Sequence, residues 1–468
     1  MKLLPLLLFL ALPAVAQAQF TFTTTNGVVT ITGYTGSNVV VTVPRTIDGL
    51  PVTSIADFTF AGCSSVTDVT IQEGVTNIGD WIFPGCTSLT NVSIPEGVTT
   101  IEDNTFNGCQ SLVKVTIPTT VTSIGPLAFF DCYDLADVII PDNVTNIGNV
   151  AFSFCTSLTN ITIPNRVINI GANAFGGCYS LASVTIPSSV VTIGDGAFSS
   201  CLSLTNLTIP VGVTSIGEEA FDWCISLKNI TIPDSVTNLG DGAFENCTGL
   251  IGIGIPNSIT EVGNDAFYGC SSLTTVEIPS SVTSIGNNAF HFCLSLTNIT
   301  IPNSVVSIGS WAISGCGNLT NITIPNSVSN VADYAFAGCP NLTSIYFNGN
   351  APSIDPTSFG TGSFIDDNLT VYYLPGTTDW TVFALLTDVP TVLWLPQMQT
   401  AAFGVHTNQF GFNINWATGQ TVVIEACTDL FNPKWQPVQT NTLATGSDYF
   451  SDPQWTNFQS RFYRLHSL

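Results

Sequence analysis

Hydrophobic and polar positions along this chain recur with a period of 23 residues. In one well-formed unit, the apolar residues Leu158, Ile161 and Ile163 follow the spacing L-x-x-L-x-L. The intervening Asn160 and Thr162 are polar, and side chains of a strand alternate between its two faces. The pattern therefore predicts a short strand with an apolar inner face and a polar outer face. Proline follows nearly every such strand and, lacking an N–H group, ends its ladder at the same place.

The second half of each unit reads Val-x-x-Ile-Gly-[Asp/Asn]-x-Ala-Phe. Such short acceptor side chains suit the N-cap of a one-turn helix or 3₁₀ turn, which is the structure we expect there. A calcium site is the weaker hypothesis, because the glycine-rich aspartate nonapeptide of stacked calcium sites is absent. Pro126 and Ala172 are exceptions at the slot after glycine, and Asp103 occupies it after Glu102. The acceptors at this slot are Asp80, Asn149, Asp195, Glu218, Asp241, Asn264 and Asn287.

The cysteines follow the same period without an insertion or deletion. A fixed period of about 20–29 residues is typical of solenoids, in which each coil buries its apolar edge against its neighbours. We therefore predict a leucine-rich repeat solenoid: a right-handed superhelix with one parallel β-sheet, short helical or 3₁₀ turns, and the outline of a rod or shallow arc. The ladder comprises Cys63, Cys86, Cys109, Cys132, Cys155, Cys178, Cys201, Cys224, Cys247, Cys270, Cys293, Cys316 and Cys339.

The full string C-x-x-L-x-x-[IV]-x-I-P-x-x-V-x-x-I-G-x-x-A-F resembles the BspA-like leucine-rich repeat family of bacterial surface and secreted proteins. The resemblance covers roughly Pro44 to Phe347, and the segment 43–55 resembles a lengthened opening coil of that family. It implies an exported, adhesive type of molecule. It supplies no catalytic residues, because the family motif consists of packing positions.

The ends of the chain differ from the repeats. Residues 1–18 combine Lys2, a short apolar run and an A-x-A site, which predicts a secretory signal peptide and a secreted or cell-surface location. No second apolar stretch is long enough to predict a transmembrane segment. We expect an N-terminal cap with an irregular first coil over 19–62, the solenoid over 63–348 and a C-terminal cap over 349–394. Alternating apolar residues between turn residues predict a small antiparallel, β-sandwich-like module over 395–468.

The ladder thiols are expected to be small buried hydrophobes rather than disulfides. Adjacent coils stack about 4.8 Å apart with parallel Cβ vectors, beyond the usual Cβ separation in a disulfide of about 3.5–4.5 Å. A linear row of thiols also spreads potential metal ligands along the stack. Cys427 lies outside the ladder, and the sequence assigns it no role.

Composition narrows the classes of function. Eight basic residues against 32 acidic ones give a net charge of −24, which repels nucleic acid and excludes it as a partner. The three histidines, His291, His406 and His466, are scattered, and no nucleophile elbow, zinc-binding helix or phosphate loop occurs. We therefore expect no enzyme, no cofactor and no metal site.

The outward strand positions form the candidate binding face, because the sheet of a solenoid is its usual binding surface. We predict binding or adhesion to a protein or glycan there; the oligomeric state is left open. Two alternatives remain. The solenoid could be a structural spacer that displays the terminal module or is anchored by it, with Asn and Thr ladders satisfying one another along the stack. Less favoured is an ancillary domain in extracellular polysaccharide processing. The candidate residues are Asn160, Thr162, Ser183, Thr185, Asn206, Thr208, Asn229, Thr231, Gly252, Gly254, Asn298 and Thr300.

Overall fold

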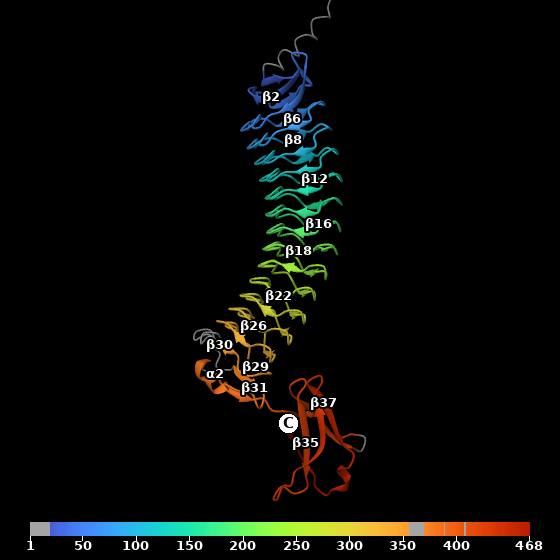
Figure 1. Ribbon diagram of the computed structural model, residues 1–468, viewed down its shortest axis with the longest axis vertical. Coiled ribbons are helices and arrows are strands. Elements are labelled where there is room, and N and C mark those ends of the chain that lie inside the picture. Colours follow the sequence, from blue (N-terminus) through green and yellow to red (C-terminus); the bar gives the residue numbers. More distant parts are fainter. Residues whose placement is uncertain (1–18, 355–368, 388, 407–408) are drawn as a thin grey trace, which may run out of the picture.

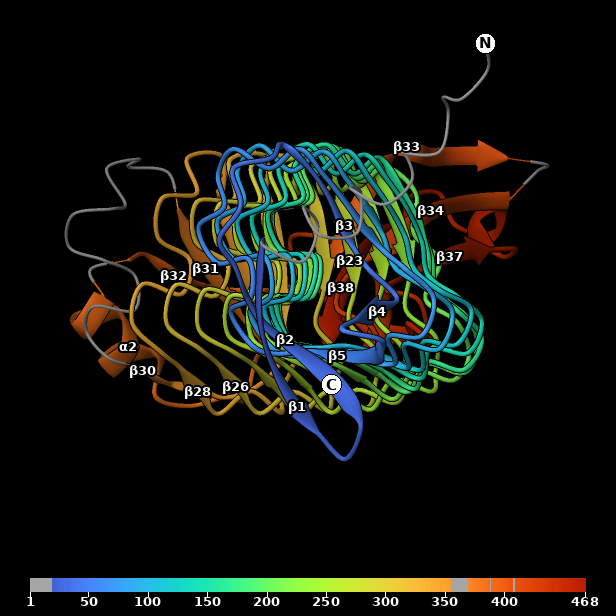
Figure 2. The ribbon, with the colours of Figure 1, turned by 90° about the horizontal axis from the view of Figure 1, so that it is seen from above.

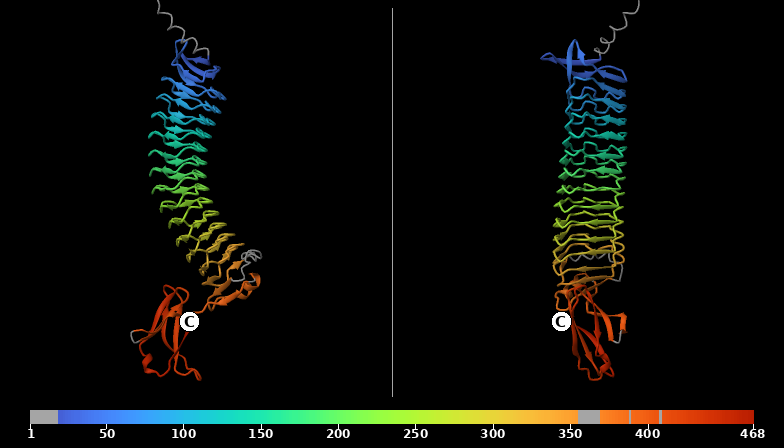
Figure 3. Two further views of the ribbon diagram at one scale, coloured as in Figure 1. Left: turned by 180° about the vertical axis from the view of Figure 1, so that it is seen from behind. Right: turned by 90° about the vertical axis from the view of Figure 1, so that its right-hand side faces the viewer.

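The protein is a β-solenoid of about 15 turns followed by a small antiparallel module. The computed structural model describes residues 19–354, 369–387, 389–406 and 409–468; the expected signal peptide lies outside this range. The coils stack into a column that curves towards its C-terminal end, where the module lies beyond β31 (Figures 1 and 3). The predicted fold class is confirmed.

The first ladder of parallel strands contains the predicted strand segments. Each strand pairs in register with the equivalent strand of a neighbouring coil, as when Asn160 lies opposite Ser183. The strands form four hydrogen-bonded runs rather than one continuous sheet. They are β3 (Val40–Val43), β6 (Asp68–Ile71), β8 (Asn91–Ser93), β10 (Lys114–Thr116), β12 (Asp137–Ile139), β14 (Asn160–Thr162), β16 (Ser183–Thr185), β19 (Asn229–Thr231), β21 (Gly252–Gly254), β23 (Thr275–Glu277), β25 (Asn298–Thr300), β27 (Asn321–Ile324), β29 (Ser344–Phe347), β31 (Thr370–Tyr373) and β32 (Thr391–Leu393).

A second ladder of two-residue strands, which we did not predict, lines another side of the column. Each of these strands ends just before the glycine of the Ile-Gly motif. At that glycine the backbone lies so close to the preceding coil that a side chain would collide with it. A Cβ on Gly171 would lie 2.6 Å from the carbonyl carbon of Gly148. The strands are β7 (Asn77–Ile78), β9 (Thr100–Ile101), β11 (Ser123–Ile124), β13 (Asn146–Ile147), β15 (Asn169–Ile170), β17 (Thr192–Ile193), β18 (Ser215–Ile216), β20 (Asn238–Leu239), β22 (Glu261–Val262), β24 (Ser284–Ile285), β26 (Ser307–Ile308), β28 (Asn330–Val331) and β30 (Ser353–Ile354).

The acceptor after that glycine does not cap a helix, so this expectation was wrong. The segment forms turns, and in the described residues the helices α2 (Trp380–Thr387) and 3₁₀-helix η1 (Trp455–Asn457) lie outside the repeats. The acceptor instead receives the backbone N–H of the same slot one coil later. Asp195 Oδ1 accepts from the N–H of Glu218 at 3.0 Å, for example. These side chains therefore tie neighbouring coils together.

One apolar core runs the length of the column, from Phe20 to Val389. Its centre is a row of buried phenylalanines, one per coil, whose ring centroids are 5.0–5.9 Å apart from Phe60 to Phe290. Ile313 replaces phenylalanine in the next coil and interrupts the row, and buried Phe336 occupies the same position one coil later. Stacked rings favour identical spacing in every coil, and this explains why the period tolerates no insertion.

The ladder cysteines lie beside this row, and their predicted burial is confirmed from Cys86 to Cys339, while Cys63 is half-buried. Each buried thiol also donates a hydrogen bond, which the sequence did not predict. Cys201 Sγ lies 3.4 Å from the carbonyl oxygen of Phe175 in the preceding coil. The thiols therefore act as weak donors within an apolar stack.

Both ends of the column are covered. At the N-terminus, β1 (Phe20–Thr25), β2 (Val28–Tyr34), β4 (Thr46–Ile47) and β5 (Leu50–Ile55) form a small sheet that joins the second ladder through β7, as seen from above in Figure 2. At the other end, Trp380 and Phe383 of α2 are buried against Phe347. These aromatic side chains close the core where the repeats stop.

The terminal module is antiparallel, as predicted, and consists of two three-stranded sheets. One sheet contains β33 (Gln397–His406), β34 (Gln409–Asn415) and β37 (Ser447–Asp452); the other contains β35 (Thr421–Cys427), β36 (Gln436–Thr442) and β38 (Phe462–Ser467). Its separate core includes Phe412, Ile424 and Phe450, and Leu374 from the end of the solenoid joins that core.

Candidate functional site

The predicted binding face lies on the outer side of the first ladder. Every Asn, Ser and Thr of the predicted set is exposed, as is Gly254, while Gly252 is half-buried. Parallel register places like positions in rows: Thr162 opposes Thr185, and Thr231 opposes Gly254. The alternation along each strand thus correctly predicts the outward orientation of these residues, and their role in binding stays a prediction.

Two parts of this face depart from the regular ladder. Asn206 forms only an isolated bridge with Ser183, so the coil containing Asn206 and Thr208 contributes no strand to the first ladder. At Gly252 and Gly254, an added Cβ would meet nothing within 4 Å, and neither glycine is needed for close packing. The face thus includes a stretch of bare backbone.

The outward asparagines bond locally rather than along the stack. Asn160 Nδ2 donates to Thr159 Oγ1 at 3.1 Å, and Asn206 Nδ2 donates to Thr205 Oγ1 at 3.3 Å. The threonine before the strand makes the link between coils, as when Thr297 Oγ1 donates to the carbonyl of Thr274 at 3.1 Å. The side-chain amides of Asn160 and Asn206 therefore donate within their own coil and form no ladder along the stack among the described contacts.

The chemistry of the face changes over its last three strands. Tyr346 of β29 opposes Tyr372 of β31, with ring centroids 5.0 Å apart and planes 19° from parallel. Trp394, directly after β32, lies 4.6 Å from the Tyr346 ring. Rings thus replace Asn and Thr at the C-terminal end of the face. The pairing of Tyr346 with Tyr372 was not predicted, because β29 and β31 are offset by 26 residues instead of 23.

The terminal module is attached at these rings. Trp416, which follows β34 and is 6% exposed, donates its indole N–H to the carbonyl of Trp394 at 2.7 Å. Leu374 packs in the module's core, so the junction combines a hydrogen bond with apolar contact. This arrangement leaves two clefts around Trp394 and Trp416.

The first cleft, of about 310 Å³, lies between the last sheet strands and the start of the module. The second, of about 460 Å³, shares Tyr346, Trp394, Asn415 and Trp416 with it and reaches back to Asn321 of the sheet face. No residue that lines either cleft is charged. The first cleft is lined by Tyr346, Tyr372, Leu393, Trp394, Leu395, Gln397, Gln399, Asn415 and Trp416.

A separate edge of the column carries exposed aromatic residues in an unfavourable backbone conformation. Two positions in each coil, four residues apart, have positive φ, which favours glycine or asparagine. Trp223 has φ 57° and is 49% exposed, and Phe292 has φ 59° and is 45% exposed. The stack of Trp311 on Tyr334, with centroids 4.4 Å apart, extends this edge.

Carboxylates lie on the same edge. Burial, followed by the neighbouring charges of Asp222, Asp265 and Glu219, raises the pKa of Glu245 to about 7. Burial raises the pKa of Asp222 to about 6. Burial lowers the pKa of His291, whose Nδ1 lies 3.2 Å from the carbonyl oxygen of Ser314. No group of three or more His, Cys, Asp or Glu in the described part of the chain is arranged to hold a metal ion.

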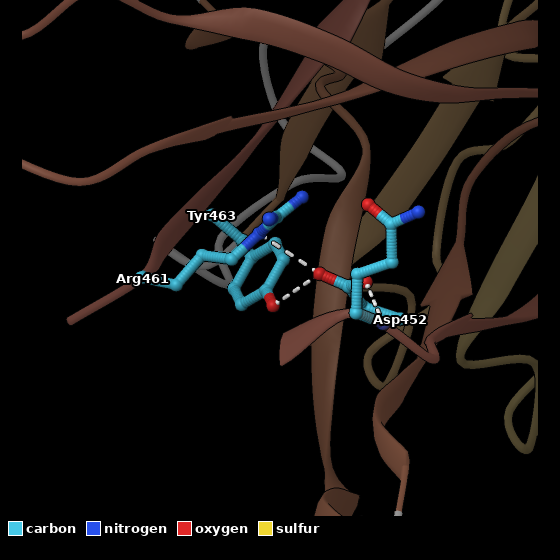
Figure 4. Close-up of polar contacts among 4 residues, drawn as sticks. Asp452, Arg461 and Tyr463 are labelled. Carbon is cyan, nitrogen blue, oxygen red and sulfur yellow. Dashed lines mark hydrogen bonds and ion pairs between the residues drawn. The ribbon is translucent and has the colours of Figure 1, made fainter. Parts of the chain in front are cut away.

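The polar cluster of the module in Figure 4 joins β38 to the end of β37. Asp452 is 5% exposed, accepts the Tyr463 hydroxyl at 2.8 Å and pairs with Arg461 Nε at 2.8 Å. The Arg461 guanidinium also lies 4.1 Å from the Phe458 ring centroid. Every member has a partner inside the module, which identifies this cluster as a structural support. Cys427 is buried nearby, beside a small cavity of about 210 Å³ that Arg461 also lines.

Comparison with known proteins identifies the repeats. A family profile described as "BspA type Leucine rich repeat region (6 copies)" matches residues 46–158, 145–274 and 260–373, which together cover well over half of the chain. The chain belongs to this family. The BspA-type repeats account for both ladders and the stacked core, and the sequence resemblance is thereby confirmed.

Solved structures of leucine-rich repeat proteins are similar to this chain, and the first of those named here supports the same fold. A leucine-rich repeat protein from Bacteroides ovatus is 28% identical, with a TM-score of 0.61 over 80% of this chain and 98% of its own. A leucine-rich cell surface protein from Faecalibacterium prausnitzii is 29% identical over 71% and 94%, with a TM-score of 0.42. The T. pallidum leucine-rich repeat protein is 32% identical over 40% and 89%, with a TM-score of 0.38. No curated protein matches the chain.

In the described residues, no helix is long and apolar enough to cross a membrane. Leucine-rich repeat families are generally non-catalytic. The repeat motif itself consists of packing residues, so a function has to be sought on the surfaces that the repeats display.

Proposed function

We propose that this protein is a secreted or cell-surface binding protein that engages a protein or glycan through the sheet face, without catalysis. The proposal rests mainly on one observation: exposed, uncharged side chains recur at equivalent positions of successive coils along this face from Asn160 to Thr231. The N-terminal export pattern and the BspA-type repeats support the location. The module serves attachment or export in this proposal.

Neutral side chains make the interaction a distributed one. A hydrogen bond to an uncharged group contributes about 0.5–1.5 kcal/mol net, so useful affinity needs contacts from several coils. Because this face carries few charged side chains, a ligand that covers it removes little water from charged groups, so the desolvation cost of binding is small. We therefore expect modest affinity that depends on the number of coils covered.

The test introduces bulky charge into the centre of the face. The triple variant Thr162→Arg, Asn206→Arg, Thr208→Arg should lose retention on purified matrix proteins or on a glycan array that retains the parent chain. All three residues are exposed, so the thermal midpoint should change little. Asn169→Arg is the control, because Asn169 is equally exposed but belongs to the second ladder. Unchanged retention by the triple variant would reject the sheet face as the binding surface and favour the spacer hypothesis.

A further inference from the structure

We propose that the two clefts at the junction of the solenoid and the terminal module, here called the junction clefts, form a binding site for a neutral glycan. This inference goes beyond the sheet-face proposal, because it assigns a separate site at one end of the molecule. Either proposal can fail alone. The lining residues, their geometry and their lack of charge favour a ligand of this kind.

The first element of the site is a platform of rings. Tyr346 and Tyr372 lie nearly parallel at 5.0 Å and are half-buried, so each ring is held by its neighbour yet remains accessible. Trp394 extends the platform at 47° to Tyr346. Stacking covers the ring faces that the two tyrosines turn towards each other, and the remaining aromatic surface of this stack and of Trp394 lines the cleft. Apolar surface of this kind suits the C–H face of a pyranose ring, which is apolar although its edge is hydroxylated.

The second element is a set of amide groups at the rim of the platform. Gln397, Gln399 and Asn415 each bring a donor and an acceptor to the cleft. Among the described residues, no hydrogen bond occupies these three side-chain amides. Sugar hydroxyls also donate and accept, so the two inventories match. Recognition by rings plus a few convergent polar groups is the usual design of a small-molecule pocket, and the cleft volumes lie within its range of about 300–1,000 Å³.

The third element is the absence of charge. The chain as a whole carries a net charge of −24, yet neither cleft is lined by an acidic or basic side chain. A cationic peptide would find no ion-pair partner in the clefts, and a polyanion would be repelled by the rest of the molecule. A neutral glycan has neither disadvantage.

The walls are fixed relative to one another, which favours binding. The indole hydrogen bond from Trp416 to Trp394 and the burial of Leu374 in the module's core join the two sides of the clefts. A preformed site loses less conformational entropy when it binds a ligand. The second cleft also opens onto Asn321 and Thr323 of β27, so a chain of several sugars could extend along the sheet face.

The experiment is affinity electrophoresis of the chain from Gln19 onwards in gels that contain one polysaccharide each. The neutral probes are hydroxyethylcellulose, xyloglucan, galactomannan, xylan and dextran; alginate is the anionic control. We expect at least one neutral probe to retard the protein and alginate to leave its mobility unchanged. Retardation by none of the neutral probes would overturn the proposal.

Variants place the binding at the clefts. Tyr346→Ala with Tyr372→Ala should raise the dissociation constant for the retarding polysaccharide at least tenfold, whereas Trp223→Ala, on the separate edge, should not change it. Asn415→Glu keeps the ring platform and adds a charge to an exposed position, so it tests the site even if the tyrosine variant unfolds. Its matched control is Asn169→Glu, at an exposed asparagine of the second ladder that lies outside both proposed sites.

The outcomes separate the two proposals. Retardation that survives both Asn415→Glu and the tyrosine variant would reject the junction clefts. If retardation survives both cleft variants but is lost in the triple arginine variant, the sheet face binds the glycan and only the sheet-face proposal stands. Loss in the cleft variants alone supports the junction site.

Discussion

Replacement of Cys201 by serine tests how the repeats are held together. Cys201 is fully buried, and its Sγ lies 3.4 Å from the carbonyl oxygen of Phe175. A hydroxyl donor needs about 2.7–2.8 Å, but the shorter C–O bond would carry the oxygen away from that carbonyl. The serine hydroxyl is therefore expected to lie in the apolar stack without a satisfactory partner.

The magnitude follows from that loss. An unsatisfied buried hydroxyl costs about 1–3 kcal/mol, whereas the carbonyl of Phe175 keeps the N–H of Cys178 at 3.3 Å and is not orphaned. Alanine at Cys201 removes one buried, methylene-sized group, worth about 0.8 kcal/mol, and leaves a small void. Serine should thus destabilise the protein at least as much as the smaller alanine.

Guanidinium unfolding under reducing conditions, followed by circular dichroism, measures both changes. Cys63→Ser is the matched control, because Cys63 is half-buried at the start of the ladder and should cost less than about 0.5 kcal/mol. Wild-type stability for Cys201→Ser would refute the reasoning, since it would mean that the coils shift enough to give the hydroxyl a bond.

Three further predictions follow from the coil geometry. Gly171→Ala should destabilise the protein by about 1–3 kcal/mol in urea unfolding, because its Cβ would meet the preceding coil; an unchanged midpoint would contradict this contact. Iodoacetamide at pH 8 should label Cys63 first by mass spectrometry, since burial raises the pKa of Cys178 to about 12; fast labelling of Cys178 would contradict its burial. The folded state favours protonated Glu245, so stability should fall as pH rises from about 4.5 through 7; Glu245→Gln should reduce this fall in urea titrations, and an unchanged pH dependence would contradict it.

The sequence predicts the repeats well because one residue type at one spacing determines each feature. Alternation through Ile161 and Ile163 gives the strand and its outward residues, and the fixed period gives the parallel stack. The second ladder was missed because two residues such as Asn169 and Ile170 are too short to show a periodicity. Its existence depends on the close approach of backbones at Gly171, a contact between coils.

The acceptor slot shows why local rules failed. A short carboxylate or amide after glycine suits an N-cap and a bond to the next coil equally well, and only the distance from Asp195 Oδ1 to the N–H of Glu218 distinguishes them.

The junction between the solenoid and the module could not be predicted for a different reason. The change of offset to 26 residues conceals the pairing of Tyr346 with Tyr372, and the contact of Trp416 with Trp394 joins two cores.

The uniformity that makes the solenoid predictable also limits what its face can recognise. Rows such as Thr162 and Thr185 offer nearly the same chemistry at each coil, so a ligand displaced by one coil would find equivalent contacts. Such a face therefore favours many simultaneous weak contacts along the column, and it does not hold a ligand at one defined coil. The end of the ladder breaks this equivalence, because Tyr346, Tyr372 and Trp394 occur there once. If the junction clefts hold one end of a glycan, the repeated face beyond Asn321 can add weak contacts in a register that the rings determine.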